Sequence, residues 1–154
     1  MKKKIVKGLI KGGLLIAMIA MMVGQPAKAQ TLAYGLRASI PFDFKVGDKT
    51  FSAGRYAVSR VQQDDVVIKV SSVEGKGNAL RGTVPVTIAK VRNSATLVFH
   101  RYGDQYYLAQ VWPAGASTGR ELPVSRGERD LKNQSGLVGQ VQKMETVTIT
   151  AELQ

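Results

Sequence analysis

The chain has 154 residues, a formal net charge of +11 and no cysteine. The absence of cysteine excludes a disulfide-stabilised scaffold, a cysteine nucleophile and a bacterial lipoprotein anchor. Six of the 22 Lys and Arg residues, and no Asp or Glu, lie in the first 29 positions, so 16 basic residues accompany 11 acidic ones in the rest. That balance of +5 is a modest excess, and we predict no nucleic acid as a partner.

The first 29 residues follow the pattern of a secretory signal peptide. Several lysines precede an apolar run over residues 14–23, and Ala27-Lys28-Ala29 supplies small residues at the cleavage positions. The apolar run is too short to cross a bilayer, which needs about 20 residues. We therefore predict cleavage after Ala29, a single domain over residues 30–154, no stable membrane span after cleavage, and a periplasmic or secreted location.

Seven strand-like runs follow in residues 30–154. Most alternate apolar and polar side chains, and the rest are apolar on both faces. The predicted strands are 37–44, 50–61 with a bulge at Ala53-Gly54, 66–72, 83–89, 95–102, 105–112 and 145–153. Polar or glycine-rich turns, such as 62–65 and 74–78, separate them. Proline has no N–H to donate, so Pro41 indicates an edge strand or a nitrogen that points away from the neighbouring strand, and Pro85 indicates an edge strand.

The segment 95–112, which reads ATLVFHRYGDQYYLAQVW, predicts a β-hairpin. Its turn is Gly103-Asp104, with a positive φ at the glycine. A two-residue turn sets the register and gives the opposed pairs Tyr102–Gln105, His100–Tyr107, Phe99–Leu108, Leu97–Gln110 and Ala95–Trp112. Both faces carry apolar side chains, so we expect both to be covered.

The part between the hairpin and the last strand predicts a loop and a helix. Residues 113–119 are rich in small residues and predict a mobile loop. Ser125, followed three residues later by Glu128, predicts a capping box and a helix over 126–133 that ends before Gly136. The whole pattern predicts an all-β fold, an antiparallel sandwich or small barrel of about seven strands with one short helix.

Three motifs resemble those of a family of small exported β-rich bacterial proteins of unknown function. IPFDFKVGDKT at 40–50 is similar to the opening of that family, FHRYGDQY at 99–106 to its central segment, and GRELP at 119–123 to its closing motif. The resemblance implies an exported domain. It implies no activity, and no catalytic residue can be transferred from it.

His100 is the only histidine, and a Ser-His-Asp site would need it as the base. A small hydrolase would combine it with Asp104 or Asp43, but no G-x-S-x-G motif supplies a nucleophile. A zinc site would need His100 together with carboxylates, so we predict no metal and no cofactor. Glu121 and Glu128 could act as paired carboxylates in glycoside cleavage, but we expect them to be a solvated charge and a helix-capping residue instead.

These observations favour a non-enzymatic binding or structural module of the cell envelope over two alternatives, the hydrolase and a lipocalin-like carrier of an apolar ligand. Its partner would be an envelope polymer or another envelope protein. Loops on a rigid β-scaffold often carry binding sites, so we expect the hairpin turn and the loop 113–119 to be the places to look. The candidate binding residues are His100, Tyr102, Asp104, Tyr106, Tyr107 and Trp112.

Overall fold

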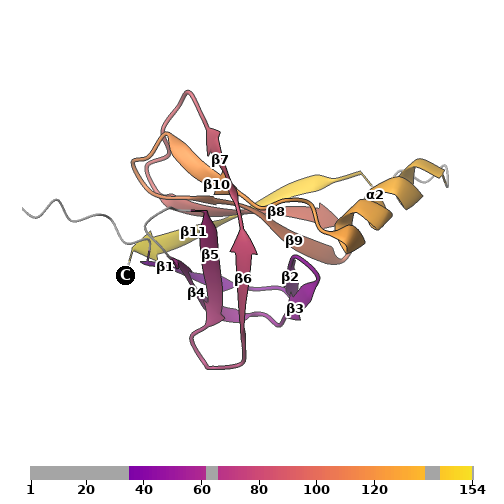
Figure 1. Ribbon diagram of the computed structural model, residues 1–154, viewed down its shortest axis with the longest axis horizontal. Helices are drawn as coiled ribbons and strands as arrows, with labels where there is room; N and C mark the ends of the chain where they lie inside the picture. Colours follow the sequence, from indigo (N-terminus) through magenta and orange to yellow (C-terminus); the bar gives the residue numbers. More distant parts are fainter. Residues whose placement is uncertain (1–34, 62–65, 138–142, 154) are drawn as a thin grey trace, which may run out of the picture. The chain divides into compact units, whose positions relative to one another are not determined.

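Within residues 35–61, 66–137 and 143–153, the parts that the computed structural model describes, the chain forms eleven strands and one helix (Figure 1). The strands are β1 (Gly35–Ile40), β2 (Phe44–Val46), β3 (Lys49–Phe51), β4 (Gly54–Arg60), β5 (Val67–Ser72), β6 (Asn78–Gly82), β7 (Val84–Thr87), β8 (Ala95–Tyr102), β9 (Gln105–Trp112), β10 (Thr118–Glu121) and β11 (Glu145–Leu153), and the helix is α2 (Arg126–Leu137). The predicted signal peptide and the predicted turn at 62–65 lie outside the described residues.

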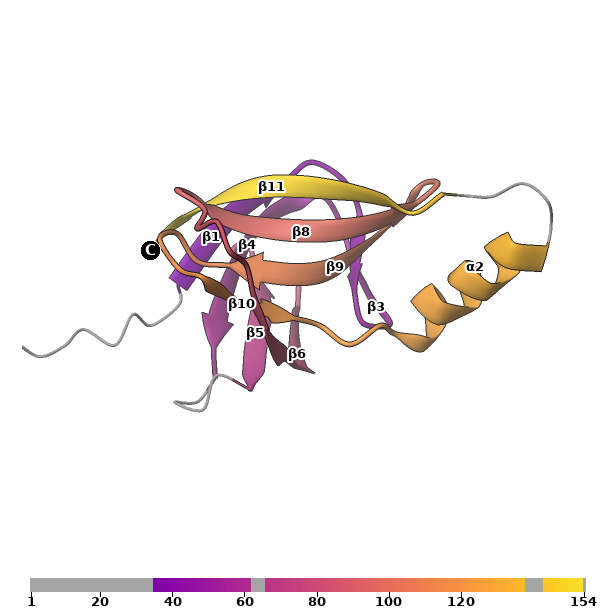
Figure 2. The same cartoon turned by 90° about the horizontal axis from the view of Figure 1, so that it is seen from above.

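The strands form one sheet that nearly closes into a barrel. Hydrogen-bonded neighbours run in the order β9, β8, β11, β1, β4, β5 and β6, and β10 pairs with both β9 and β7. Only Thr83 separates β6 from β7, so the path returns through β7 and β10 to β9. Figure 2 shows β11, β8 and β9 side by side. The predicted β-rich class with one short helix is confirmed, and the sheet is barrel-like.

The prediction of about seven strands is wrong. The run 37–44 breaks after Ile40 into β1 and β2, and the run 50–61 breaks before Gly54, where β3 ends and β4 begins. Two further strands, β6 and β10, were not predicted. Both are short and contain few apolar residues in alternation, so their sequences carry almost no period-two signal.

The two prolines behave differently. Pro41 lies outside a strand, because β1 ends at Ile40, and β1 itself is not an edge strand, because it lies between β11 and β4. Pro85 lies within β7, which pairs only with β10 among the described strands. Pro85 therefore lies in a strand with a neighbour on one side only among the described strands, as predicted for an edge.

Large side chains fill the interior of the barrel. Along β1, residues 36, 38 and 40 are buried while 37 and 39 are exposed, as expected for a strand with one face in the core. The Phe44 ring meets Phe99 and Tyr56 edge to face, with centroids 5.6 and 4.9 Å apart. The core members with under 2% exposure are Leu36, Ile40, Phe44, Val46, Val58, Val70, Leu97, Phe99 and Val111.

The hairpin of β8 and β9 forms as predicted near its turn, where Gly103 has φ +60°. The pairs Tyr102–Gln105, His100–Tyr107 and Phe99–Leu108 are confirmed. A bulge between Val98 and Phe99 then shifts the register by one residue, so the two outer predicted pairs are wrong: Leu97 faces Val111, and Thr96 faces Trp112. Because of this shift, Val111 enters the core and Trp112 turns to the opposite face, where it packs against Gly119.

Helix α2 begins at the predicted residue and is longer than predicted. It continues to Leu137 and therefore includes Gly136. A glycine lowers helix stability by about 1 kcal/mol but does not forbid helical geometry. No helix in the described ranges is long and apolar enough to cross a membrane.

Candidate functional site

The structure divides the six predicted binding residues between two places. His100, Tyr102, Tyr107 and Trp112 lie on the face of the hairpin that is turned away from the barrel core, and the last three are only 4%, 2% and 1% exposed. Asp104 and Tyr106 lie at the hairpin tip and line a surface depression. The two groups therefore have different chemistry and are described separately.

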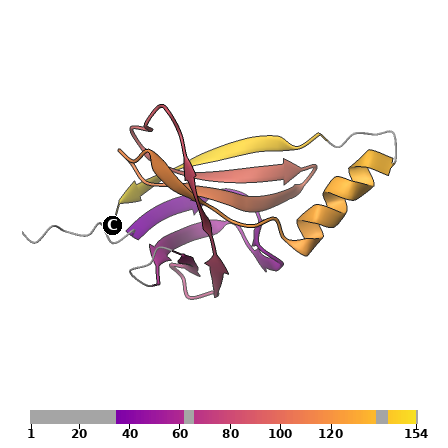
Figure 3. The same ribbon diagram turned by 45° about the horizontal axis from the view of Figure 1, so that its top comes forward.

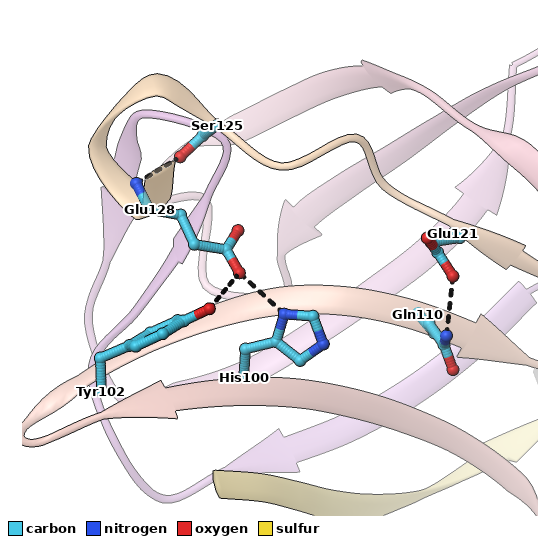
Figure 4. A network of polar contacts seen from close by, with 6 residues as sticks. All are labelled: His100, Tyr102, Gln110, Glu121, Ser125 and Glu128. Carbon is cyan, nitrogen blue, oxygen red and sulfur yellow. Dashed lines mark hydrogen bonds and ion pairs between the residues drawn. The ribbon is translucent and has the colours of Figure 1, made fainter. Parts of the chain in front are cut away.

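The first place is a polar network that joins the hairpin to α2 (Figure 4). His100 Nδ1 lies 2.7 Å from Glu128 Oε1, and the Tyr102 hydroxyl donates to the same oxygen at 3.3 Å. Glu128 is 4% exposed, while the His100 side chain keeps 26% of its surface. The nearly buried Glu128 carboxylate thus accepts hydrogen bonds from two side chains of β8. Because a carboxylate oxygen can only accept, His100 Nδ1 is the donor.

The start of α2 explains how this carboxylate reaches the hairpin. The Glu128 backbone N–H donates to Ser125 Oγ at 3.2 Å, which confirms Ser125 as the cap. The Gly127 N–H donates to Asp48 Oδ1 at 3.4 Å, which joins the same turn to the β2–β3 connection. Figure 3 shows the helix beginning at the hairpin end of the sheet and extending beyond the strands.

The Glu128 side chain plays a different role from the one predicted. In a complete capping box it would reach back to the backbone N–H of Ser125. Here its Oε1 lies against β8 instead, so the interpretation of Glu128 as a capping and solvated residue misses its main contacts. In the structure Ser125 and Glu128 are the two buried residues among positions 125–131, and the sequence carried no signal for this beyond their capping-box spacing.

Tyr102 is kept protonated by its surroundings. Burial of the phenol, followed by the nearby Glu128 carboxylate, raises the pKa of Tyr102 to about 12. The hydroxyl is therefore a hydrogen-bond donor at any physiological pH. It serves the network by stabilising the Glu128 carboxylate.

A histidine beside a carboxylate is two thirds of a catalytic triad, and the missing part is a nucleophile. The hydroxyls nearest the network are already engaged: Tyr102 donates to Glu128, and Ser125 accepts from the helix backbone. No bond between His100 and a hydroxyl is present in the described parts of the chain. The partners of His100 predicted for a hydrolase, Asp104 and Asp43, line the separate depression at the hairpin tip.

That depression, the second place, has a volume of about 370 Å³. It lies where the hairpin tip meets β2 and β3, and it is lined by Asp43, Phe44, Lys45, Thr50, Asp104, Gln105 and Tyr106. Lys45 Nζ donates to Gln105 Oε1 at 2.8 Å and to the Tyr107 hydroxyl at 3.3 Å. Asp43 Oδ1 accepts from the Ala53 N–H at 2.8 Å. These bonds fix the lining before any ligand arrives.

The aromatic part of the lining is also held in place. Phe42 stacks on Tyr106 with ring centroids 3.9 Å apart, and the Arg101 guanidinium lies 5.5 Å from the centre of the same ring. Tyr106 is therefore a rigid wall of the depression. Asp104 is exposed at the turn and Gln105 follows it, so polar groups stand next to this wall.

No group of three or more His, Cys, Asp or Glu residues that could hold a metal ion occurs in residues 35–61, 66–137 and 143–153. Comparison with known proteins found no matching family model, no matching curated protein and no matching solved structure. The function is therefore argued from the residues of this chain alone.

Proposed function

We propose that this chain is an exported, non-enzymatic module of the cell envelope that binds a polar, hydroxyl-rich ligand in the depression at the hairpin tip. The observation that carries the proposal is the composition of that depression on a rigid β-scaffold. Asp43 and Asp104 offer carboxylate oxygens, Thr50 a hydroxyl, and Gln105 and Lys45 polar hydrogens. Export is supported by the signal-peptide pattern of the first 29 residues.

The charges of the depression favour a neutral ligand. Two carboxylates and one ammonium group line it, and the ammonium already donates to Gln105 and Tyr107. An anion would meet both carboxylates, whereas sugar hydroxyls can donate to them. The sugar units of an envelope polymer have this chemistry.

A hydrolase that uses His100 is the second candidate, because His100 and Glu128 lie 2.7 Å apart. Against it stands the engagement of both neighbouring hydroxyls described above. A lipocalin-like carrier has less support, because aromatic and branched side chains fill the barrel interior that a carried ligand would occupy.

Two experiments test the proposal. For export, the intact mass of protein recovered from the cell envelope should match a chain that begins at Gln30. Recovery of only the full-length chain in the cytoplasm would contradict export. For binding, the full chain is titrated with neutral chito-, malto- and cello-oligosaccharides while backbone amide shifts are recorded.

Saturable shifts should centre on the hairpin tip, β2 and β3. Asp104→Ala should weaken the binding roughly tenfold, the loss of one charge-assisted hydrogen bond. The matched control is Asp130→Ala, which removes an exposed carboxylate on α2 instead. Shifts that centre elsewhere, or equal losses in the two variants, would contradict the site. Ester hydrolysis that disappears in His100→Gln would support the hydrolase instead.

A further inference from the structure

A second depression lies on the outer surface of the barrel, over β11, β1 and β4. Its volume is about 400 Å³, and its lining residues are Arg37, Ala38, Ser39, Arg55, Val73, Thr150 and Glu152. It shares no residue with the depression at the hairpin tip. Its chemistry is also different, because two guanidinium groups face it instead of two aspartates.

The strand register brings the two arginines together. β1 lies between β11 and β4, with Arg37 opposite Ala57 and Ser39 opposite Arg55. Arg37 and Arg55 are thus diagonal neighbours on adjacent strands, about 7–8 Å apart in an antiparallel pair and within reach of one small ligand. Burial of residues 36, 38 and 40 in the core keeps positions 37 and 39 on the outer surface.

The polar groups of this depression match a phosphate ester. A guanidinium presents parallel N–H donors that fit phosphate oxygens, and the hydroxyls of Ser39 and Thr150 can donate as well. A single acidic residue, Glu152, is part of the lining, and the register places it opposite Arg37. A carboxylate there accepts a hydrogen bond from a hydroxyl group of the ligand.

We propose that this depression binds a phosphorylated sugar, with the phosphate between Arg37 and Arg55 and a sugar hydroxyl on Glu152. The volume suits a ligand of that size, since small-molecule sites are usually about 300–1,000 Å³. Val73, which is 43% exposed, gives the sugar ring an apolar contact. The inference is independent of the proposed function, because it concerns a different site and a charged ligand.

The test is a titration of the full chain with glucose 6-phosphate and, in parallel, with inorganic phosphate, followed by backbone amide shifts. We expect saturable shifts in β1, β4 and the second half of β11, and weaker binding at higher salt. Arg37→Gln and Arg55→Gln should each weaken glucose 6-phosphate binding roughly tenfold or more. Glu152→Gln should weaken glucose 6-phosphate binding and strengthen inorganic phosphate binding, because a repelling charge is removed.

Lys69→Gln is the matched control, since Lys69 is an exposed cation on the neighbouring strand β5 outside the lining. It should leave binding within about twofold of the original, the loss expected from screened long-range attraction. An equal loss in Lys69→Gln and Arg55→Gln would overturn the proposal in favour of general electrostatic attraction. Absence of saturable shifts would overturn it as well, and so would unchanged selectivity in Glu152→Gln. The remaining amide shifts verify that each variant is folded.

Discussion

The contact between His100 and Glu128 can be measured as a coupling energy. His100→Ala leaves a carboxylate that is 4% exposed with the Tyr102 hydroxyl as its remaining side-chain donor from β8. A hydrogen bond to a charged group contributes about 1.5–3 kcal/mol to stability. The His100 side chain is 26% exposed, so water replaces part of the lost bond. We therefore expect a loss near the middle of that range, about 2 kcal/mol.

The assay is urea unfolding of four chains: the original, His100→Ala, Glu128→Ala and the double variant. The free energies of unfolding of all four chains are measured in the same buffer. If the two groups interact, the double variant is less destabilised than the sum of the single variants, by about 1–2 kcal/mol. The thermal midpoint of His100→Ala should also fall by about 8 °C, at about 4 °C per kcal/mol for a domain of this size.

A second pair in the same view provides the comparison. Gln110 Nε2 donates to Glu121 Oε2 at 2.9 Å and joins β9 to β10 (Figure 4). Both side chains are half-buried, so their coupling should be smaller than that of His100 and Glu128. Strict additivity for His100 and Glu128, or a stability of His100→Ala within about 0.5 kcal/mol of the original, would refute a structural role for the contact.

Three further predictions concern stability. The pKa of Tyr102 is about 12 in the folded chain against an ordinary value of 10.0 for tyrosine, so the Tyr102 hydroxyl loses its proton first in the unfolded chain. The free energy of unfolding should therefore fall as pH rises from 10.0 towards 12. Urea midpoints measured across this pH range should fall less in Tyr102→Phe than in the original chain. A Cβ at Gly119 would lie 2.5 Å from the Trp112 ring, so Gly119→Ala should lower the free energy of unfolding by about 1–3 kcal/mol, measured by tryptophan fluorescence. Gly82→Ala is the control and should not lower it in this way, because no atom lies within 4 Å of a Cβ at Gly82. Ser125→Ala should lower stability by about 0.5–2 kcal/mol, and an unchanged denaturation midpoint would contradict its role as the helix cap.

Local signals in the sequence predicted much of the fold. The turn at Gly103-Asp104 fixes the hairpin, because a positive φ and a two-residue loop set the nearest pairs without help from the rest of the chain. The bulge at Val98 leaves no such mark. It accompanies the packing of Trp112 against Gly119 and of Val111 in the core, and these contacts between distant elements cannot be read from the local sequence. The two pairs beyond the bulge, Leu97–Gln110 and Ala95–Trp112, were therefore predicted wrongly.

Some residues of the candidate sites could likewise be predicted from local sequence, and others depend on how distant elements pack. Asp104 and Tyr106 could be predicted because a hairpin tip is exposed whatever else the fold contains. Glu128 was missed because its spacing from Ser125 already had a sufficient local explanation. Only the tertiary placement of α2 over β8 brings it to His100, 28 residues away in sequence. The arginines of the outer depression were missed too, since the sequence does not give the β1–β4 register that makes Arg37 and Arg55 diagonal neighbours.

The near-closure of the barrel determines where the domain should open first. The path around the sheet is completed by β7 and β10, which share four residue pairs, whereas β8 and β11 share seven. Thr83 holds the corner before β7, where its N–H and its hydroxyl both donate to the Val66 carbonyl, at 2.7 and 3.0 Å. A short ladder with one face in solvent has the fewest contacts to lose, so native-state hydrogen exchange should release the amides of β7 and β10 well before those of β8 and β11. The barrel would then open by local unfolding of β7 and β10, while the β8–β9 hairpin and β11 stay folded.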